Sequence, residues 1–205
     1  MTNTFYTEAY TIKTIVSWTG NQDRLKAVKE VRKSLPSSVK VLDIGTGTGE
    51  YSSWIGNEEG CHWTGNDIVS PEVSGVQMPK NGSFIQGDFL AIDVAGKYDL
   101  IIDQGAIFTT LEDQERDEYL KKVYSLLNEG GVFLVLTLYA TNPTDIGRIW
   151  IFNGNRKRVF ICKDELQTLN GFKSGYSQID TYEVGHKNNP TSEVLPIVQV
   201  ALHKC

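Results

Sequence analysis

Apolar and polar positions along the chain follow two periodicities in turn, which predict helices and strands. Apolar residues recur at helical spacing over residues 21–35, and Pro36 ends that segment. The same spacing recurs over residues 113–127, and Gly130-Gly131 is expected to end that helical region. Short apolar runs predict five strands, over residues 39–44, 61–68, 83–86, 98–103 and 132–138.

The last part of the chain follows a different pattern. A short helix is predicted over residues 163–169, and two strand-like segments follow over residues 176–186 and 194–203. Consecutive strands joined by a short loop pair antiparallel, so these two segments are expected to form a C-terminal hairpin. Residues 148–161 predict another hairpin, because an Asn-Gly pair at residues 153–154 lies between two alternating segments.

Strands that alternate with helices predict right-handed βαβ units and a mainly parallel sheet, here closed by an antiparallel hairpin. The 205 residues contain no internal repeat, low-complexity tract or obvious linker, so we expect one domain. Its expected parts are an N-terminal flap and helix, a core, a hairpin insertion, and a C-terminal helix and hairpin, over residues 1–37, 38–140, 141–162 and 163–205.

The stretch from Val41 to Gly49 is the most informative local sequence. An apolar strand ends in an acid, and three glycines then alternate with threonines before a helix-like segment that starts at Glu50. Glycine tolerates positive φ and lets a ligand lie on the backbone, while the N–H groups of a new helix attract anionic groups. The dinucleotide pattern would require Gly or Ala in place of Glu50, and no Walker A lysine follows. The loop is therefore expected to bind a small, polar, partly anionic ligand.

Acidic residues also follow the other predicted strands. Asp67, Asp88 and Asp103 stand at the ends of the second, third and fourth strands, as Asp43 stands at the end of the first. Ligands of open α/β sheets bind beyond the carboxyl ends of the strands, so these acids are expected at one edge. One acid in such a position is often only a cap or turn former, but four with a glycine loop indicate a binding site.

Four stretches together, Val41–Gly49, Gly65–Ile68, Gly87–Phe89 and Tyr98–Gly105, resemble the motif series of class I S-adenosylmethionine (SAM)-dependent methyltransferases. The resemblance covers roughly residues 38–140 and, by topology, the C-terminal hairpin. It implies a Rossmann-like three-layer α/β/α sandwich with a mostly parallel seven-stranded sheet. It also implies SAM as the cofactor, S-adenosylhomocysteine as the product, and no metal.

The resemblance assigns roles to individual residues on the methionine and ribose side of the cofactor. Asp67 would bind the ribose hydroxyls. The run from Asp67 to Glu72 carries one residue more than the usual acid-hydrophobic-Ser-Pro-Glu run, which leaves the start of the following helix undefined. The methionine moiety would be held by Asp43, Gly45, Thr46, Gly47 and Gly49.

On the adenine and transfer side, the resemblance implies four further residues. Asp88 would contact the adenine amine, and Phe89 or Ile68 would lie against the ring. Asp103 would lie near the sulfonium and the substrate, where it is also a candidate catalytic base.

The segment Asp103–Phe108 gives the best indication of the methyl acceptor. It is similar to the D-x-G stretch of thiopurine methyltransferase-like enzymes and to the D-K-G-T stretch of some protein lysine methyltransferases. Gln104 and Ala106 replace the Lys and Thr of the second pattern, which favours a small-molecule acceptor. The Asn/Asp-Pro-Pro-aromatic signature of adenine amino-methylation is absent at this position, so a nucleic-acid substrate is not favoured.

Two aromatic segments are candidates for covering the substrate. The N-terminal segment contributes Tyr10 and Trp18, and the predicted hairpin contributes Trp150 and Phe152. Together with Gln104, these four side chains are the candidate substrate contacts. Packing of the N-terminal aromatic residues against the edge of the sheet is an equally good interpretation.

The expected reaction is methyl transfer to a nitrogen, sulfur or oxygen atom of a small molecule. Because the sulfonium of SAM is already activated, transfer needs alignment and exclusion of water, and a base matters more for a hydroxyl acceptor. His62, His186 and His203 are poor base candidates, since the first opens a strand and the others lie in the tail hairpin.

Composition limits the partners. Hydrophobic residues make up 40% of the chain, and the net charge of −5 argues against broad nucleic-acid contact. Three scattered cysteines indicate no disulfide framework or zinc site, and no apolar run is long enough for a membrane span, so a cytoplasmic monomer or homodimer is expected. Two alternatives stay open: a protein lysine or N-terminal methyltransferase that attracts a basic peptide, and a SAM-binding regulator without turnover.

Overall fold

The computed structural model describes residues 22–138, 140, 144, 149–152, 156–159, 172–184 and 193–204. The helices are α2 (Gln22–Lys33), α3 (Glu50–Ile55), α4 (Pro71–Ser74) and α5 (Asp113–Leu126), with a 3-10 turn η1 (Phe108–Thr110). The strands of the main sheet are β1 (Val39–Ile44), β2 (Cys61–Asp67), β3 (Ser83–Gln86), β4 (Tyr98–Gln104), β5 (Leu127–Leu138), β8 (Phe172–Val184) and β9 (Glu193–Lys204).

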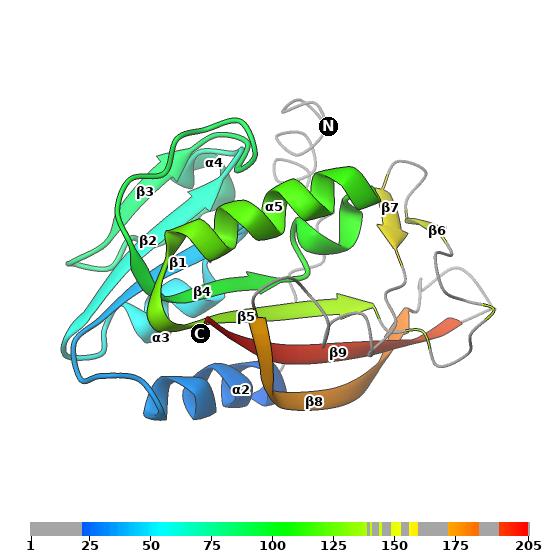
Figure 1. Ribbon diagram of the computed structural model, residues 1–205. Helices are drawn as coiled ribbons and strands as arrows, with labels where there is room; N and C mark the ends of the chain where they lie inside the picture. The colour runs from blue at the N-terminus through cyan, green and yellow to red at the C-terminus, as the bar shows by residue number, and fades with distance from the viewer. Residues whose placement is uncertain are drawn as a thin grey trace.

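The main sheet has the strand order β3-β2-β1-β4-β5-β9-β8 (Figure 1). β1 pairs in parallel with β2 and β4, which places Val41 between Trp63 and Leu100. The pairs β2–β3 and β4–β5 are also parallel, whereas β9 is antiparallel to both β5 and β8. The predicted α/β fold, a mostly parallel sheet with a C-terminal antiparallel pair, is therefore confirmed.

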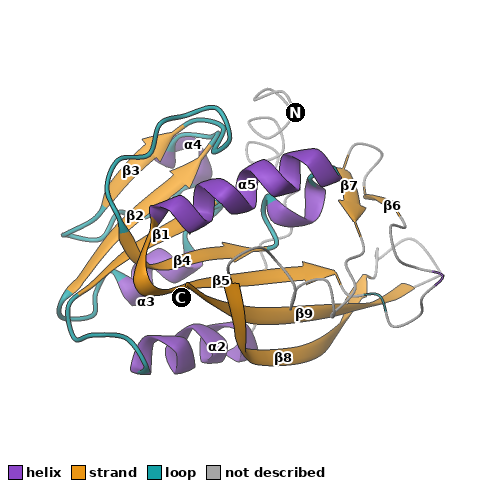
Figure 2. Ribbon diagram, viewed as in Figure 1, coloured by secondary structure: helices purple, strands orange, loops and turns teal. Residues whose placement is uncertain are grey.

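Helices cover both faces of the sheet, with α5 on one side and α2 on the other (Figure 2). Alternate residues of each buried strand point to opposite faces, so Val41 and Leu42 enter different clusters. On the α5 side, Leu42 packs with Phe133 and Tyr119. On the other side, Val41 packs with Val28 of α2 and with residues of α3. The two clusters form the core of a three-layer sandwich.

The helix predicted over residues 113–127 is confirmed to within one residue, since α5 spans Asp113–Leu126. The start of the next strand is not where it was predicted: β5 begins at Leu127 and not at residue 132, so Gly130-Gly131 lie inside it. Leu127 takes an extended conformation directly after the helix and pairs with Tyr98. The register then shifts before Val132, and Gly130 adopts a φ of +73° within that irregular stretch. The glycines accommodate a bulge in the strand and do not cap the helix.

The predicted hairpin after β5 is present. β6 (Ile149–Phe152) and β7 (Arg156–Val159) form a separate two-stranded antiparallel sheet, with Ile149 opposite Val159 and Phe152 opposite Arg156. The predicted helix over residues 163–169 and the N-terminal flap up to residue 21 lie outside the described residues. Within the described part of the chain, no helix is long and apolar enough to cross a membrane.

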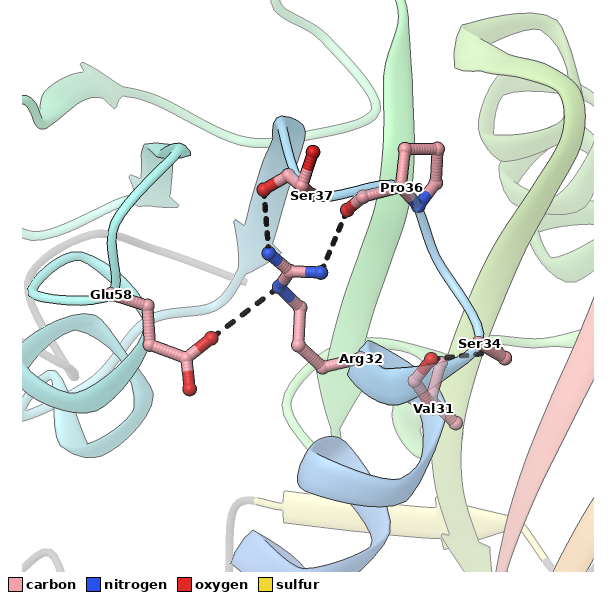
Figure 3. A network of polar contacts seen from close by, with 6 residues as sticks. All are labelled: Val31, Arg32, Ser34, Pro36, Ser37 and Glu58. Carbon is pink, nitrogen blue, oxygen red and sulfur yellow. Dashed lines mark hydrogen bonds and ion pairs between the residues drawn. The ribbon is translucent and has the colours of Figure 1, made fainter.

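Arg32 ties together the segments at the amino ends of the first strands (Figure 3). Its Nη1 and Nη2 donate hydrogen bonds to the carbonyl oxygens of Pro36 and Ser37 over 2.8 and 2.9 Å. Its Nε lies 3.4 Å from Glu58 Oε2, in the turn before β2. The last turn of α2, the loop into β1 and the turn into β2 are thus joined by a single guanidinium group.

Candidate active site

The glycine loop follows β1 in a conformation that favours glycine. Gly45, Gly47 and Gly49 have φ values of +65°, +60° and +78°. A Cβ atom on Gly45 would also lie 2.2 Å from the Cβ of Ala106, in the loop after β4. The absence of a side chain therefore allows the loops after β1 and β4 to touch.

The end of β2 holds this loop in place. The N–H groups of Gly45 and Thr46 both donate to the carbonyl oxygen of Asn66, over 2.7 and 3.0 Å. The Thr46 hydroxyl donates to the carbonyl oxygen of Asp43 over 3.0 Å and is buried. Thr46, predicted as a cofactor contact, therefore directs its hydroxyl into the loop itself.

Asp67 joins the end of β2 to the same loop. Its Oδ2 accepts a hydrogen bond from the N–H of Gly47 over 2.8 Å, and its Oδ1 accepts one from the N–H of Val69 over 3.1 Å. The residue is 8% exposed, and the next residue, Ile68, is half-buried.

The carboxylate of Asp43 is buried at the end of β1, and its Oδ2 has no hydrogen-bond partner among the described residues. The pKa of Asp43 is raised to about 8, mainly by burial and to a smaller extent by the nearby carboxylates of Asp103 and Asp67. The indole N–H of Trp63 opposes this rise in pKa, although it does not reach hydrogen-bond geometry. Asp43 is therefore placed to change protonation when a cation binds beside it.

Asp103 is fully buried at the end of β4, where its hydrogen bonds are made within the protein. Its Oδ1 accepts from the N–H of Ala106 over 2.8 Å, and its Oδ2 accepts from the N–H of Phe108 and the hydroxyl of Tyr119 over 2.9 and 2.8 Å. Burial raises its pKa, and these donors oppose the rise. The carboxylate organises residues 105–108 and has no exposed surface towards a substrate.

The loop after β3 places its two predicted residues differently. Asp88 is exposed, and its Oδ1 accepts the N–H of Leu90 over 3.0 Å. Phe89 is fully buried, with its ring centroid 5.2 Å from that of Tyr119. Lys122 Nζ lies 4.9 Å from the centre of the Phe89 ring and donates to the Phe89 carbonyl oxygen over 2.6 Å. Phe89 therefore belongs to the core, which corrects the expectation that it stacks on the adenine ring.

Gln104 is the predicted substrate contact whose surroundings the structure describes. Its Oε1 accepts hydrogen bonds from Gln199 and Tyr51, two residues that no sequence motif marks. Trp150 and Phe152 lie on β6, on the hairpin that follows β5. Tyr10 and Trp18 fall outside the described residues.

In the part of the chain that the structure describes, several buried polar atoms without a hydrogen-bond partner gather at the carboxyl edge of the central strands. They include Asp43 Oδ2 at the end of β1, Asn66 Oδ1 near the end of β2 and Gln104 Nε2 at the end of β4. Buried polar groups are nearly always paired in folded proteins, so these three atoms are available to a polar ligand or to water. Both acceptors and a donor are available there.

Comparison with known proteins agrees with this arrangement. Residues 41–131 match a family described as a methyltransferase domain, which spans the glycine loop and most of the sheet from β1 to β5. No curated protein sequence matches the chain.

Several solved methyltransferases share the fold. The 1,6-didemethyltoxoflavin-N1-methyltransferase of Burkholderia thailandensis, with 1,6-didemethyltoxoflavin and S-adenosylhomocysteine bound, has a TM-score of 0.73 at 19% identity, over 99% of this chain and 87% of that one. A SAM-dependent methyltransferase from Anabaena variabilis has a TM-score of 0.72 at 13% identity, over 99% and 93%. TehB from Haemophilus influenzae has a TM-score of 0.66 at 19% identity, over 97% and 67%.

The matched domain and the fold are those of class I SAM-dependent methyltransferases. The predicted enzyme class and cofactor are therefore confirmed, while the methyl acceptor is a separate question.

Proposed function

We propose that the protein transfers the methyl group of SAM to a nitrogen, sulfur or oxygen atom of a small molecule, and that the carboxyl edge of β1, β2 and β4 binds the cofactor. The observation that carries this proposal is the pairing of the Asp67 carboxylate with the Gly47 N–H, which joins the predicted ribose acid to the glycine loop. This hydrogen bond brings the glycine loop and the acid at the end of β2, which are 20 residues apart in sequence, into contact.

The residues at this edge fit the chemistry of SAM. The amino acid part of SAM carries an ammonium and a carboxylate, and the unpartnered Asp43 Oδ2 suits the ammonium. The side-chain-free backbone of Gly45, Gly47 and Gly49 would lie against the methionine part.

The ribose and the adenine would lie towards β2 and β3. Asp67 would accept hydrogen bonds from the ribose hydroxyls, and the exposed Asp88 would receive the adenine amine. Phe89 and Ile68 were the residues predicted to lie against the adenine ring. Ile68 stays a candidate for this contact, because it is half-buried and follows Asp67.

The chain contributes alignment and shielding. SAM supplies a methyl group on a sulfonium that is already activated for in-line displacement. Asp103 acts as a positioning residue in this proposal, since its two oxygens hold the loop that contacts Gly45. A thiol or amine acceptor needs no strong base, which agrees with a site whose Asp103 is buried.

Two considerations support a small-molecule acceptor. The neighbour from Burkholderia thailandensis is a methyltransferase solved with the small molecule 1,6-didemethyltoxoflavin. Gln104 and Ala106 also replace the Lys and Thr of the pattern found in some lysine methyltransferases. The scattered cysteines support the proposed cytoplasmic location, and a monomer or homodimer remains the prediction for the assembly.

The test is a calorimetric titration with SAM and S-adenosylhomocysteine, followed by a labelled-methyl assay on a fractionated cell extract. We expect binding of both compounds and label in the low-mass fraction, whose mass spectrum then identifies the acceptor. Label on protein would instead support a protein methyltransferase. Binding without label in any fraction would support the SAM-binding regulator, and no binding would refute the cofactor site.

A further inference from the structure

A polar contact beside the glycine loop joins three segments that are far apart in the sequence. Gln104 ends β4, Gln199 lies in β9, and Tyr51 lies in α3 directly after the loop. Gln199 Nε2 donates to Gln104 Oε1 over 2.7 Å, and the Tyr51 hydroxyl donates to the same oxygen over 3.3 Å. Two donors therefore converge on a single carboxamide oxygen.

The register of the sheet explains how the two glutamines meet. Leu136 of β5 pairs with Gln104 on one side and with Gln199 on the other, so the three residues form one row across β4, β5 and β9. Residues of one row point to the same face, and glutamine side chains are long enough to meet over the intervening leucine. Gln199 is 5% exposed and Leu136 is 4% exposed, so this contact is shielded from water.

The contact gives the Gln104 carboxamide a fixed polarity. Its oxygen is used by Gln199 and Tyr51, which leaves the amino group as the part that can serve a ligand. Gln104 Nε2 is buried and has no hydrogen-bond partner within the described residues. A buried donor without a partner is unfavourable, and an oxygen lone pair from a ligand would relieve it.

We infer that Gln104 donates a hydrogen bond from Nε2 to a carbonyl or carboxylate oxygen of a bound ligand, and that Gln199 is a positioning residue that fixes this polarity. This inference rests on the proposed function. If the oxygen belongs to the methyl acceptor, the inference narrows the acceptor class, because an alkylammonium group and the Gln104 amino group are both donors and do not pair. The oxygen belongs either to the methyl acceptor or to the carboxylate of SAM.

Three variants test the polarity. Gln104→Met removes the amino group while it keeps a side chain of similar length. Gln199→Glu replaces the anchoring donor with a carboxylate, so the Gln104 carboxamide must turn and donate to it. Tyr51→Phe removes the weaker donor and is the mildest change. Gln114→Glu on the exposed face of α5 makes the same change of charge away from the site and serves as the control.

Two ligands separate the possible sources of the oxygen. S-adenosylhomocysteine carries the amino acid carboxylate, and 5′-methylthioadenosine lacks it. The methyl acceptor is supplied as the low-mass fraction of the extract, and an apparent KM is measured against the amount of that fraction. Circular dichroism and thermal unfolding establish that each variant is folded.

If the oxygen belongs to SAM, Gln104→Met and Gln199→Glu should each weaken the binding of S-adenosylhomocysteine by about tenfold. The affinity for 5′-methylthioadenosine should stay unchanged. If it belongs to the methyl acceptor, both variants should raise the apparent KM for the low-mass fraction by about tenfold. The Kd values of S-adenosylhomocysteine and 5′-methylthioadenosine should then stay unchanged. In either case the double variant should be no worse than Gln104→Met, because Gln199 acts through Gln104. Tyr51→Phe should change the affected quantity, Kd or apparent KM, by less than the other two variants. Gln114→Glu should change neither the Kd of S-adenosylhomocysteine nor the apparent KM.

The inference would be overturned if a folded Gln199→Glu kept the Kd values of both ligands and the apparent KM of the unaltered protein. The amino group of Gln104 would then already face residue 199 and not the ligand. Additive losses in the double variant would overturn it too, because Gln199 would act independently of Gln104. Failure of the unaltered protein to bind S-adenosylhomocysteine would refute the proposed function as well.

Discussion

The amino and carboxyl ends of the parallel strands differ in the partners of their buried polar groups. At the amino ends, Nη1 and Nη2 of Arg32 donate to two backbone carbonyl oxygens, and its Nε, which makes no hydrogen bond to the described part of the chain, lies 3.4 Å from Glu58 as an ion pair (Figure 3). At the carboxyl ends, Asp43 and Gln104 hold buried polar atoms that have no partner among the described residues. The contacts of Arg32 join chain segments, while Asp43 and Gln104 offer an acceptor and a donor to a ligand. Stability and binding are thus concentrated at opposite edges of one sheet.

Variants at the two ends should therefore separate two measurements. Changes at the carboxyl end should mainly alter the Kd of S-adenosylhomocysteine, and changes at the amino end should mainly alter the free energy of unfolding. The first three predictions test this separation, from the largest expected effect to the smallest, and the fourth concerns the pH dependence of stability.

Gly45→Ala should have the largest effect, with cofactor affinity reduced by more than about 100-fold. The new Cβ would lie 2.2 Å from the Cβ of Ala106 at a φ of +65°, so the loops after β1 and β4 must separate. Titration with S-adenosylhomocysteine measures the effect. Gly75→Ala is the matched control, because Gly75 has a φ of +78° and a Cβ added there would meet no atom within 4 Å. Equal losses in both variants would show that backbone strain alone is responsible.

Asp67→Ala should weaken the binding of S-adenosylhomocysteine by about 1–3 kcal/mol, or roughly 5- to 150-fold. The variant removes the predicted ribose contact together with the hydrogen bond to the Gly47 N–H. Calorimetry on the folded variant measures the change, and adenine serves as a ligand without ribose. Unchanged affinity in a folded Asp67→Ala would remove the ribose assignment.

Arg32→Met should lower the free energy of unfolding by about 1–3 kcal/mol and leave the Kd of S-adenosylhomocysteine unchanged. The variant keeps a long apolar side chain but leaves the carbonyl oxygens of Pro36 and Ser37 without their charged donor. Urea unfolding measures the loss. The adjacent Lys33→Met is the control, since Lys33 is 70% exposed and lies on the surface. A loss of ligand affinity in Arg32→Met would mean that the two edges are coupled.

Asp43→Asn should change a different quantity, the dependence of the free energy of unfolding on pH. The pKa of Asp43 rises from an ordinary value of 3.8 to about 8 in the folded state. Between these values the folded chain keeps a proton that the unfolded chain releases, so Asp43 makes stability fall as pH rises from about 4 to about 8. Urea unfolding at pH 5 and pH 8 should show a smaller fall in Asp43→Asn than in the unaltered protein. An identical pH dependence in the two proteins would contradict the raised pKa.

Local sequence patterns were sufficient for most of the central sheet. The predicted strand over residues 39–44 coincides with β1, and the predicted segment over residues 83–86 coincides with β3. Buried parallel strands are short, apolar and bounded by loops, so their positions are visible without tertiary information. The start of β5 was not visible in this way, because the Leu127–Tyr98 pairing across strands begins the strand before the glycines.

The site was predictable only where its residues are neighbours in sequence. The acids and glycines at the strand ends form local motifs, but the direction of a side chain depends on the loop that carries it. Asp88 accepts the N–H of Leu90, and in this turn Phe89 is directed into the core. The Gln104–Gln199 contact spans 95 residues and has no local signature, so only the sheet register reveals it.

The position of β9 has a consequence for how the protein matures. β9 lies between β5 and β8, although β8 precedes it in the chain, and β9 is the strand through which β8 joins the sheet. During synthesis, β8 therefore waits until β9 has left the ribosome before it can pair. Gln199 arrives on that same strand. The Gln104–Gln199 contact therefore forms only once β9 has paired with β5.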